Sequence, residues 1–369
     1  MISQQSYSPA WIESFKRQRQ YRTVNPALFE KMIYAFSLLE LLAGTGLDFI
    51  FKGGTSLMLM PIGSDRFSID IDIVTSQSKA ELDNVLKRLI AGSAFTNFHK
   101  DEGRFNKNGI PKAHYSFDFA AIANRDGNIV LDVLFEENPY ASIIRAEIRN
   151  TWIDTKDPYL LVNIPSVNSI LGDKLTAFAP TTTGVKYWLG NPDAADKRIE
   201  IIKQLHDVSK LIDYCSDIVE TKDVFQRIAR HQIAYRSQNI EVENVIDDIF
   251  ETALILAKRE RNRKEPDLSR FADLQSGLSM FKEYLITGSF RIEAAIIASA
   301  KAACFTQAFH QDISFSFQLF NESINMADWN ISNPEFNFLN RFKRTNKAAF
   351  FYWYKCLELK NLIDIGLGK

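Results

Sequence analysis

The sequence predicts two domains: an α/β (α+β) domain with a small mixed sheet over residues 1–165, and a mostly α-helical domain over residues 166–369. Three observations predict this division. The chain of 369 residues is longer than one core usually organises, since domains average roughly 150 residues. Segments with the period-2 alternation of strands occur only in the first part. From Ser166 onward the spacing of apolar residues becomes helical and stays so.

Composition places the chain among ordinary globular proteins, because 46% of its residues are hydrophobic and 24% are charged. No apolar stretch approaches the ~20 residues that span a bilayer, and the N-terminus lacks the apolar core of a secretion signal. The three cysteines are far apart and suit a reducing compartment. We therefore expect a cytoplasmic protein without a membrane partner. A net charge of −1 leaves any nucleic-acid partner to a local basic surface.

Hydrophobic periodicity gives the expected elements. In the first part, helices are expected at 8–45, 55–60 and 78–91. Strands are expected at 47–51, 67–74, 114–120, 129–135 and within 158–165, with a turn at 124–128. In the second part, helices are expected at 166–179, 193–216, 221–236, 239–259, 267–286, 288–308 and 345–362.

Two carboxylates interrupt the strand expected at 67–74. Asp70 and Asp72 are two residues apart, so both project from one face, roughly 6 to 7 Å from each other. Carboxylates this close repel unless a cation lies between them, and Mg²⁺ is the usual cation for hard oxygen ligands. Asp132 lies in another apolar run, IVLDVLF. If the two strands are neighbours, three acids converge on one or two metal ions, as phosphoryl and nucleotidyl transfer require.

A glycine pair precedes these acids. Gly53 and Gly54 follow an expected strand and precede an expected helix, so the backbone there can approach a triphosphate closely. Thr55 and Ser56 add hydroxyl donors. The segment is not a Walker A loop, because no lysine follows at the required spacing.

The combination of GG-T-S, an hDhD strand and a later acidic strand resembles the polymerase-β-type nucleotidyltransferase superfamily. Within it, FKGGTSL followed by RFSIDID is similar to the AbiEii/AbiGii toxin family. ILGDKLTAFAP, with Lys174, and EIIKQLHDVSKLID, with Lys203 and Asp207, match two later motifs of that family. The resemblance covers about residues 25–215. The chain departs from it at Met58 and Met60 and in the inserted loop TTTGVKYWLGNP.

The resemblance implies transfer of a nucleoside monophosphate (NMP) from a nucleoside triphosphate (NTP) to an acceptor hydroxyl, with Mg²⁺ or Mn²⁺ as cofactor. The implied acceptor is RNA, with the 3′ end of tRNA as the expected site. The implied role is the toxin of a toxin–antitoxin or abortive-infection system used in phage defence, with a cognate antitoxin as partner. By this resemblance the metal ligands are Asp70, Asp72 and Asp132, the last being a ligand or the base for the acceptor. The implied nucleotide-binding residues are Gly53, Gly54, Thr55, Ser56, Arg66, Lys174 and Lys203, and the further catalytic residues are Lys174 and Asp207.

Several alternatives stay open. The acids can be the solvated face of a strand, and Lys203 and Asp207 can be an ordinary i,i+4 ion pair. His114 and His206 are interpreted as structural. The acceptor can instead be a protein or a small molecule such as an aminoglycoside, or the chain can be a silent nucleotide-binding module. Candidate RNA contacts are the basic residues at 258–264 and 341–347.

Overall fold

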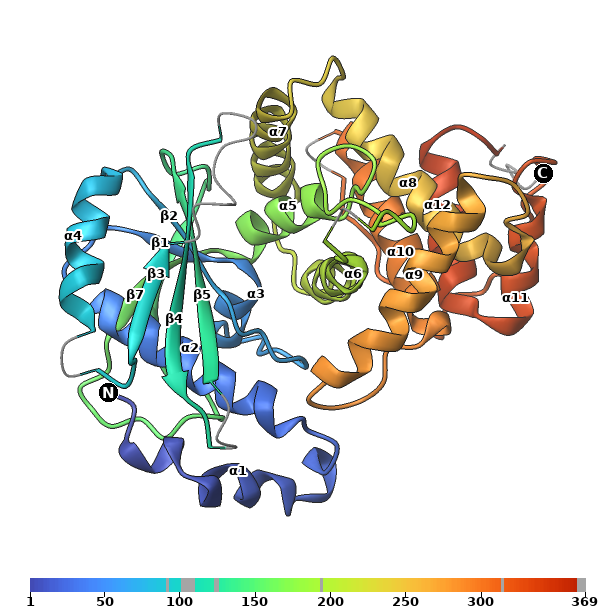
Figure 1. Cartoon of the computed structure of the whole chain (residues 1–369). Helices are drawn as coiled ribbons and strands as arrows, with labels where there is room; N and C mark the ends of the chain where they lie inside the picture. Colours follow the sequence, from blue (N-terminus) through green and yellow to red (C-terminus); the bar gives the residue numbers. More distant parts are fainter. Residues whose placement is uncertain (91–92, 101–109, 123–125, 193–194, 313–314, 364–369) are drawn as a thin grey trace. The chain divides into compact units, whose positions relative to one another are not determined.

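A computed structural model describes residues 1–90, 93–100, 110–122, 126–192, 195–312 and 315–363 (Figure 1). Helices make up much of the chain, and the described residues form one seven-stranded sheet. The chain divides into two compact units. Unit 1 comprises Met1–Ser166 and Glu283–Ser289, and unit 2 comprises Val167–Lys282 and Phe290–Lys369. The expected turn at 124–128 and the ends of two expected helices, at 91 and 193–194, lie partly outside the described residues.

Unit 1 holds the mixed sheet, which confirms the expected fold class. Its strands are β1 (Ile50–Lys52), β2 (Ile71–Thr75), β3 (Asn97–Lys100), β4 (Lys112–Ala120), β5 (Asp126–Phe135), β6 (Ile143–Glu147) and β7 (Leu161–Pro165). The order across the sheet is β3-β4-β5-β2-β1-β7-β6. The pairs β2–β5 and β1–β7 are parallel, and the other neighbouring pairs of these strands are antiparallel. The helices of the unit are α1 (Pro9–Lys16), α2 (Pro26–Ala43), α3 (Gly53–Ser56) and α4 (Lys79–Leu89).

One face of the sheet forms the core of unit 1. Its apolar side chains alternate along the central strands, and buried examples are Phe51, Ile71, Ile73, Leu131 and Val133. Helix α2 packs against β2 and β5. Helix α4 is attached to the same face because the Tyr115 hydroxyl donates to Asp83 Oδ1 at 2.5 Å. Burial and this contact with Asp83 raise the pKa of Tyr115 above its ordinary value. Because successive side chains of a strand point to opposite faces, the polar residues of these strands lie on the other face of the sheet.

The structure interrupts or shortens some expected elements for local reasons. The expected helix at 8–45 is broken, because Asn25 caps a new helix with Pro26 in its first turn. The expected strand at 67–74 begins only at Ile71. Residues before it pair elsewhere: Arg66 forms a bridge with Leu285, and the Phe67 N–H donates to Tyr284 O at 2.8 Å. That pairing also attaches Glu283–Ser289 to unit 1 and ends the expected helix at 267–286 early.

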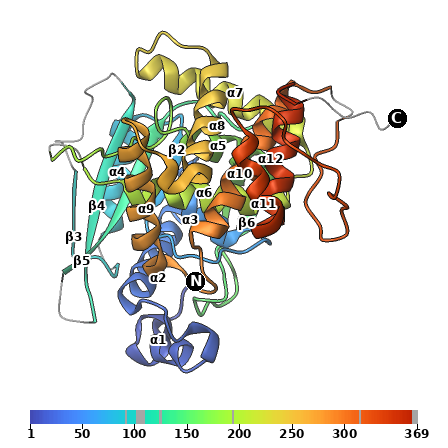
Figure 2. The same cartoon turned by 90° about the vertical axis from the view of Figure 1, so that its right-hand side faces the viewer.

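Unit 2 is helical. It contains α5 (Val167–Ala177), α6 (Arg198–Asp213), α7 (Ile218–Tyr235), α8 (Val242–Lys258), α9 (Asp267–Phe281), α10 (Ile292–Gln307), α11 (Phe342–Thr345) and α12 (Lys347–Leu359). Helix α10 packs against α6, α8 and α12, as Figures 1 and 2 show. The segment Ile292–His310 is long and apolar enough to cross a membrane, contrary to the expectation from sequence, but 78% of its most apolar window is buried within the fold. It is the central helix of unit 2.

Candidate active site

A row of four polar residues, each partly exposed, crosses the polar face of the sheet in unit 1. The strand register places Lys52 opposite Asp72, Asp72 opposite Asp132, and Asp132 opposite His114. Residues that are directly opposite on neighbouring strands share a face, and the strands are about 4.8 Å apart. The strands of Asp72 and Asp132 are thus neighbours, as the sequence analysis required for these acids to lie close together, and they run parallel. Two carboxylates lie side by side between two basic side chains.

The glycine turn lies directly against one of these carboxylates. Gly53 has φ +76°, a conformation that residues with a Cβ rarely adopt. A Cβ at this position would lie 2.1 Å from Asp72 Oδ2. A Cβ at Gly54 would lie 2.5 Å from an Arg66 guanidinium nitrogen and 2.8 Å from Ser68 Oγ. Both glycines are therefore required so that the side chains of Asp72, Arg66 and Ser68 can approach the turn.

The two hydroxyl residues after the glycines hold the turn together. Thr55 Oγ1 donates to Asp70 O at 2.6 Å, and Ser56 Oγ donates to Gly53 O at 2.9 Å. Both side chains are buried. This differs from the expectation that the hydroxyls face a phosphate, because each already donates to a carbonyl of the fold. The helix expected at 55–60 begins two residues earlier than expected, since α3 starts at Gly53.

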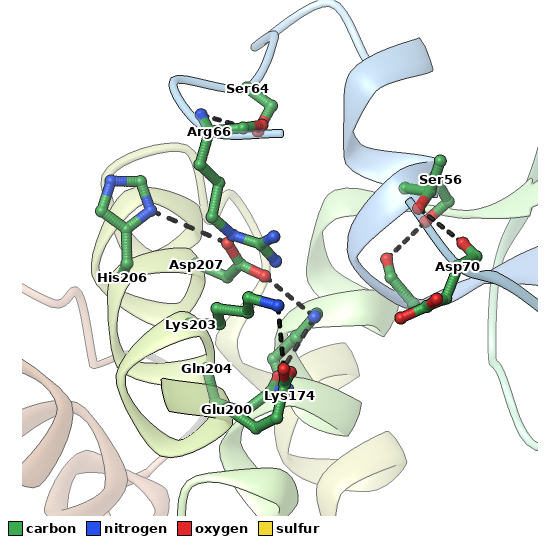
Figure 3. A network of polar contacts seen from close by, with 12 residues as sticks. Ser56, Ser64, Arg66, Asp70, Lys174, Glu200, Lys203, Gln204, His206 and Asp207 are labelled. Carbon is green, nitrogen blue, oxygen red and sulfur yellow. Dashed lines mark hydrogen bonds and ion pairs between the residues drawn. The ribbon is translucent and has the colours of Figure 1, made fainter. Parts of the chain in front are cut away.

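Arg66 is almost fully buried, with 2% of its surface exposed. One of its guanidinium nitrogens donates to Phe67 O at 3.0 Å, and its backbone is held by Ser64, as Figure 3 shows. A buried guanidinium needs several acceptors. The structure therefore gives Arg66 a role in shaping the wall beside Gly54, and a contact with a nucleotide stays a prediction.

The carboxylates suit a magnesium ion whose remaining coordination positions are filled by the substrate. Asp72 and Asp132 lie opposite each other on neighbouring strands, whereas Asp70 lies exposed before β2 begins. Among the described residues, no group of three or more His, Cys, Asp or Glu side chains is arranged to hold an ion. This differs from the expected convergence of three acids. Magnesium is commonly bound by one or two carboxylates together with substrate phosphates and water, so the Asp72–Asp132 pair has suitable donors.

A second cluster lies within unit 2, where it joins the two later motifs. Lys174 on α5 contacts Asp207 Oδ2 on α6 at 2.9 Å and donates to Gln204 Oε1 at 3.1 Å (Figure 3). Only 6% of the Lys174 side chain and 2% of the Asp207 side chain are exposed. A buried ion pair of this kind is sensitive to loss of either member. The structure thus brings Lys174 and Asp207 together across 33 positions of sequence.

Lys203 and His206 occupy the same helix as Asp207. Lys203 contacts Glu200 Oε1 at 2.8 Å, an i,i+3 pair along α6. The His206 ring lies between Phe281 and Phe290, with ring centroids 5.1 Å from each. Its Nδ1 is 3.7 Å from Asp207 Oδ1. His206 therefore packs in an aromatic setting beside the buried pair.

Of the four residues in the row, Lys52 was not predicted from the sequence, and His114 was interpreted as structural. Lys52 directly precedes the glycine pair, and His114 lies in the strand HYSFDFA. Their positions follow only from the register of β1 with β2 and of β4 with β5. Alternation predicts the face of each residue within its own strand, but it does not predict which residue lies opposite.

Substitution of Gly53 tests the contact with Asp72. Gly46 is a matched control, since it has φ +77° and nothing lies within 4 Å of where a Cβ would be. We expect Gly46→Ala to cost about 1 to 2 kcal/mol for the backbone alone. Gly53→Ala should cost more and should lower the NMP transfer that the resemblance implies, because its Cβ displaces the Asp72 carboxylate. Equal losses of unfolding free energy and activity in the two variants would contradict this.

Comparison with known proteins adds to this geometry. The family model described as nucleotidyl transferase AbiEii toxin, type IV TA system, matches residues 38–284. A structure of a candidate nucleotidyltransferase from H. pylori has 15% identity and a TM-score of 0.33, covering 72% of this chain and 98% of its own. An antigenic nucleotidyltransferase-like protein from Paracoccidioides brasiliensis has 13% identity and a TM-score of 0.35, covering 57% and 94%. None of the curated proteins matches the chain.

Proposed function

Because the chain belongs to the AbiEii nucleotidyl transferase toxin family and is a nucleotidyltransferase, we propose that it moves an NMP from an NTP to a hydroxyl of RNA, the 3′ end of tRNA being the favoured acceptor. The observation that carries the proposal is the pairing of Asp72 with Asp132 beside the turn at Gly53. The protein would act in the cytoplasm, where modification of RNA would arrest cell growth. A cognate antitoxin would restrain this activity.

Each residue in the proposed site has a role that its chemistry allows. Asp72 and Asp132 would hold Mg²⁺, or Mn²⁺ in its place, with Asp70 joining them once substrate is bound. Once bound there, the ion would neutralise charge on the NTP phosphates. In the alternative arrangement, Asp132 would be the base that accepts the proton of the acceptor hydroxyl instead of a metal ligand. The Gly53–Gly54 turn would admit the phosphates to the backbone, and Arg66 would supply positive charge there. Nucleotide binding by Lys174 and Lys203 stays a prediction from the family resemblance.

RNA as the acceptor is supported by a basic surface in unit 2. The two basic segments, 258–264 and 341–347, lie near each other, since a guanidinium nitrogen of Arg341 donates to the carbonyl oxygen of Ala257, the residue just before the first segment. Burial, followed by the guanidinium groups of Arg261 and Arg259, lowers the pKa of Arg341. Arg261 and Arg344 are exposed. Positively charged side chains that lie close together repel one another, and a polyanion such as RNA relieves this repulsion. Contacts with phosphates supply most of the affinity for nucleic acid.

Charge reversal on this surface tests the RNA contact. We expect Arg261→Glu/Arg344→Glu to weaken RNA binding and to lower the slope of log affinity against log salt by about 1 for each phosphate contact removed. Lys87→Glu/Arg88→Glu on α4 is the control, since these residues are also exposed. The measurement is binding of bulk tRNA over a range of salt concentrations. An unchanged slope in the first variant would exclude this surface as the RNA contact.

The whole proposal is tested by following label from each NTP in turn. The purified protein is incubated with Mg²⁺, one α-labelled NTP and, separately, total RNA, total protein or an aminoglycoside. Label in RNA, lost when Mg²⁺ is chelated, is the expected result. Label in protein or drug alone would assign a different acceptor. NTP binding without any transfer would favour the silent nucleotide-binding module.

A further inference from the structure

His114 is the end of the polar row, and it contacts a carboxylate of the proposed metal pair. Its Nδ1 lies 2.5 Å from Asp132 Oδ1. Because an ionised carboxylate only accepts hydrogen bonds, the imidazole is the donor. The side chain of His114 is 19% exposed and that of Asp132 is 38% exposed. The contact joins β4 to β5 at positions that the strand register places directly opposite each other.

The contact with His114 affects how the Asp132 carboxylate is oriented toward Asp72. Asp132 lies between Asp72 on one side and His114 on the other. Like charges directly opposite each other on neighbouring strands repel, so a carboxylate left alone would rotate away from its neighbour. A hydrogen bond at Oδ1 fixes the rotation of the carboxylate, so that its remaining lone pairs, those of Oδ2 included, keep one direction toward a ligand.

We propose that His114 is a positioning residue that orients the Asp132 carboxylate for binding a divalent cation together with Asp72. The inference rests on the proposed function, since it assumes that this carboxylate pair binds the ion. Hydrogen-bond partners of ligating carboxylates commonly contribute 10–100-fold in metal affinity, by orienting the ligand and keeping it basic. His114 contacts the carboxylate and not the substrate, so its effect is expected in metal affinity first.

The sheet offers a matched control for a histidine–carboxylate pair. His99 on β3 lies 3.6 Å, through Nδ1, from Asp118 Oδ2 on β4. The side chain of His99 is 57% exposed. This pair lies on the same sheet but outside the row. A general effect of removing a histidine from the sheet would therefore appear in both positions.

The experiment is a titration of the full chain with Mn²⁺ alone, followed by electron paramagnetic resonance of the free ion. His114→Leu should weaken Mn²⁺ binding by about 10–100-fold. His114→Asn, whose amide nitrogen can replace Nδ1 as donor, should bind close to the unsubstituted protein, and His99→Leu should be unchanged. The same order should appear in the Mg²⁺ concentration required for half-maximal transfer, with the maximal rate recovered at high Mg²⁺.

Asp72→Asn separates failure of the inference from failure of the proposed function. If Asp72→Asn loses Mn²⁺ binding and His114→Leu keeps it, the metal pair stands and the role of His114 is overturned. If neither substitution changes Mn²⁺ binding, the metal pair itself is excluded and the inference falls with it. If His114→Asn loses binding as fully as His114→Leu while circular dichroism reports an intact fold, orientation by hydrogen bonding is overturned.

Discussion

Asp72→Asn is expected to lower NMP transfer by on the order of 10³-fold while the protein stays folded. Loss of a metal ligand removes several kcal/mol of transition-state stabilisation, and each 1.4 kcal/mol is about a tenfold change in rate. Asparagine has nearly the same shape, so it keeps the packing against Gly53 while removing the negative charge. The loss should therefore appear in the rate of transfer and not in the thermal midpoint.

The measurement is transfer of label from NTP to RNA at saturating NTP, with the thermal midpoint recorded for the same preparation. Asp118→Asn is the control, because Asp118 is a partly exposed carboxylate on the same sheet outside the row. Its activity should be unchanged. Transfer by Asp72→Asn within tenfold of the unsubstituted protein would show that the carboxylate pair is the solvated face of a strand.

The sequence predicted the faces of the strands better than their partners. Period-2 alternation placed Asp72 on the polar face and Ile71 and Ile73 on the core face, as the structure has them. That Asp132 lies opposite Asp72 depends on pairing between segments 60 positions apart, and no local pattern encodes it. The edge strands β3 and β6 were missed because their sequences, NFHK and IIRAE, lack clean alternation at the edge of the sheet.

The helical unit shows the same limit. Helical spacing predicted α5 to α10 and α12 within about five residues of their ends, because these helices carry apolar residues at helical intervals, and α10 is buried on nearly all sides. The contacts between helices were not predicted. Spacing along α6 suggested Lys203 as a partner for Asp207, but it gave no sign that Lys174 reaches Asp207 from a different helix. The contact of Arg341 with Ala257 O, 84 positions away in sequence and next to the first basic segment, was not predicted for a similar reason.

Lys174→Met is expected to destabilise unit 2 by about 3 to 5 kcal/mol. It leaves the carboxylate of Asp207, 2% exposed, without the amine that contacts it at 2.9 Å. For a unit of this size the thermal midpoint should fall by roughly 10 °C. Activity should fall as well, but a destabilised variant alone does not say whether Lys174 acts on the nucleotide.

The double variant Lys174→Met/Asp207→Leu separates these two roles. Replacement of a buried ion pair by apolar side chains of similar volume is often neutral or stabilising, so its midpoint should return close to that of the unsubstituted protein. If Lys174 and Asp207 contribute to transfer, the stable double variant stays inactive, because neither the ammonium nor the carboxylate is restored. Recovery of both stability and NMP transfer would instead show that the pair only joins α5 to α6.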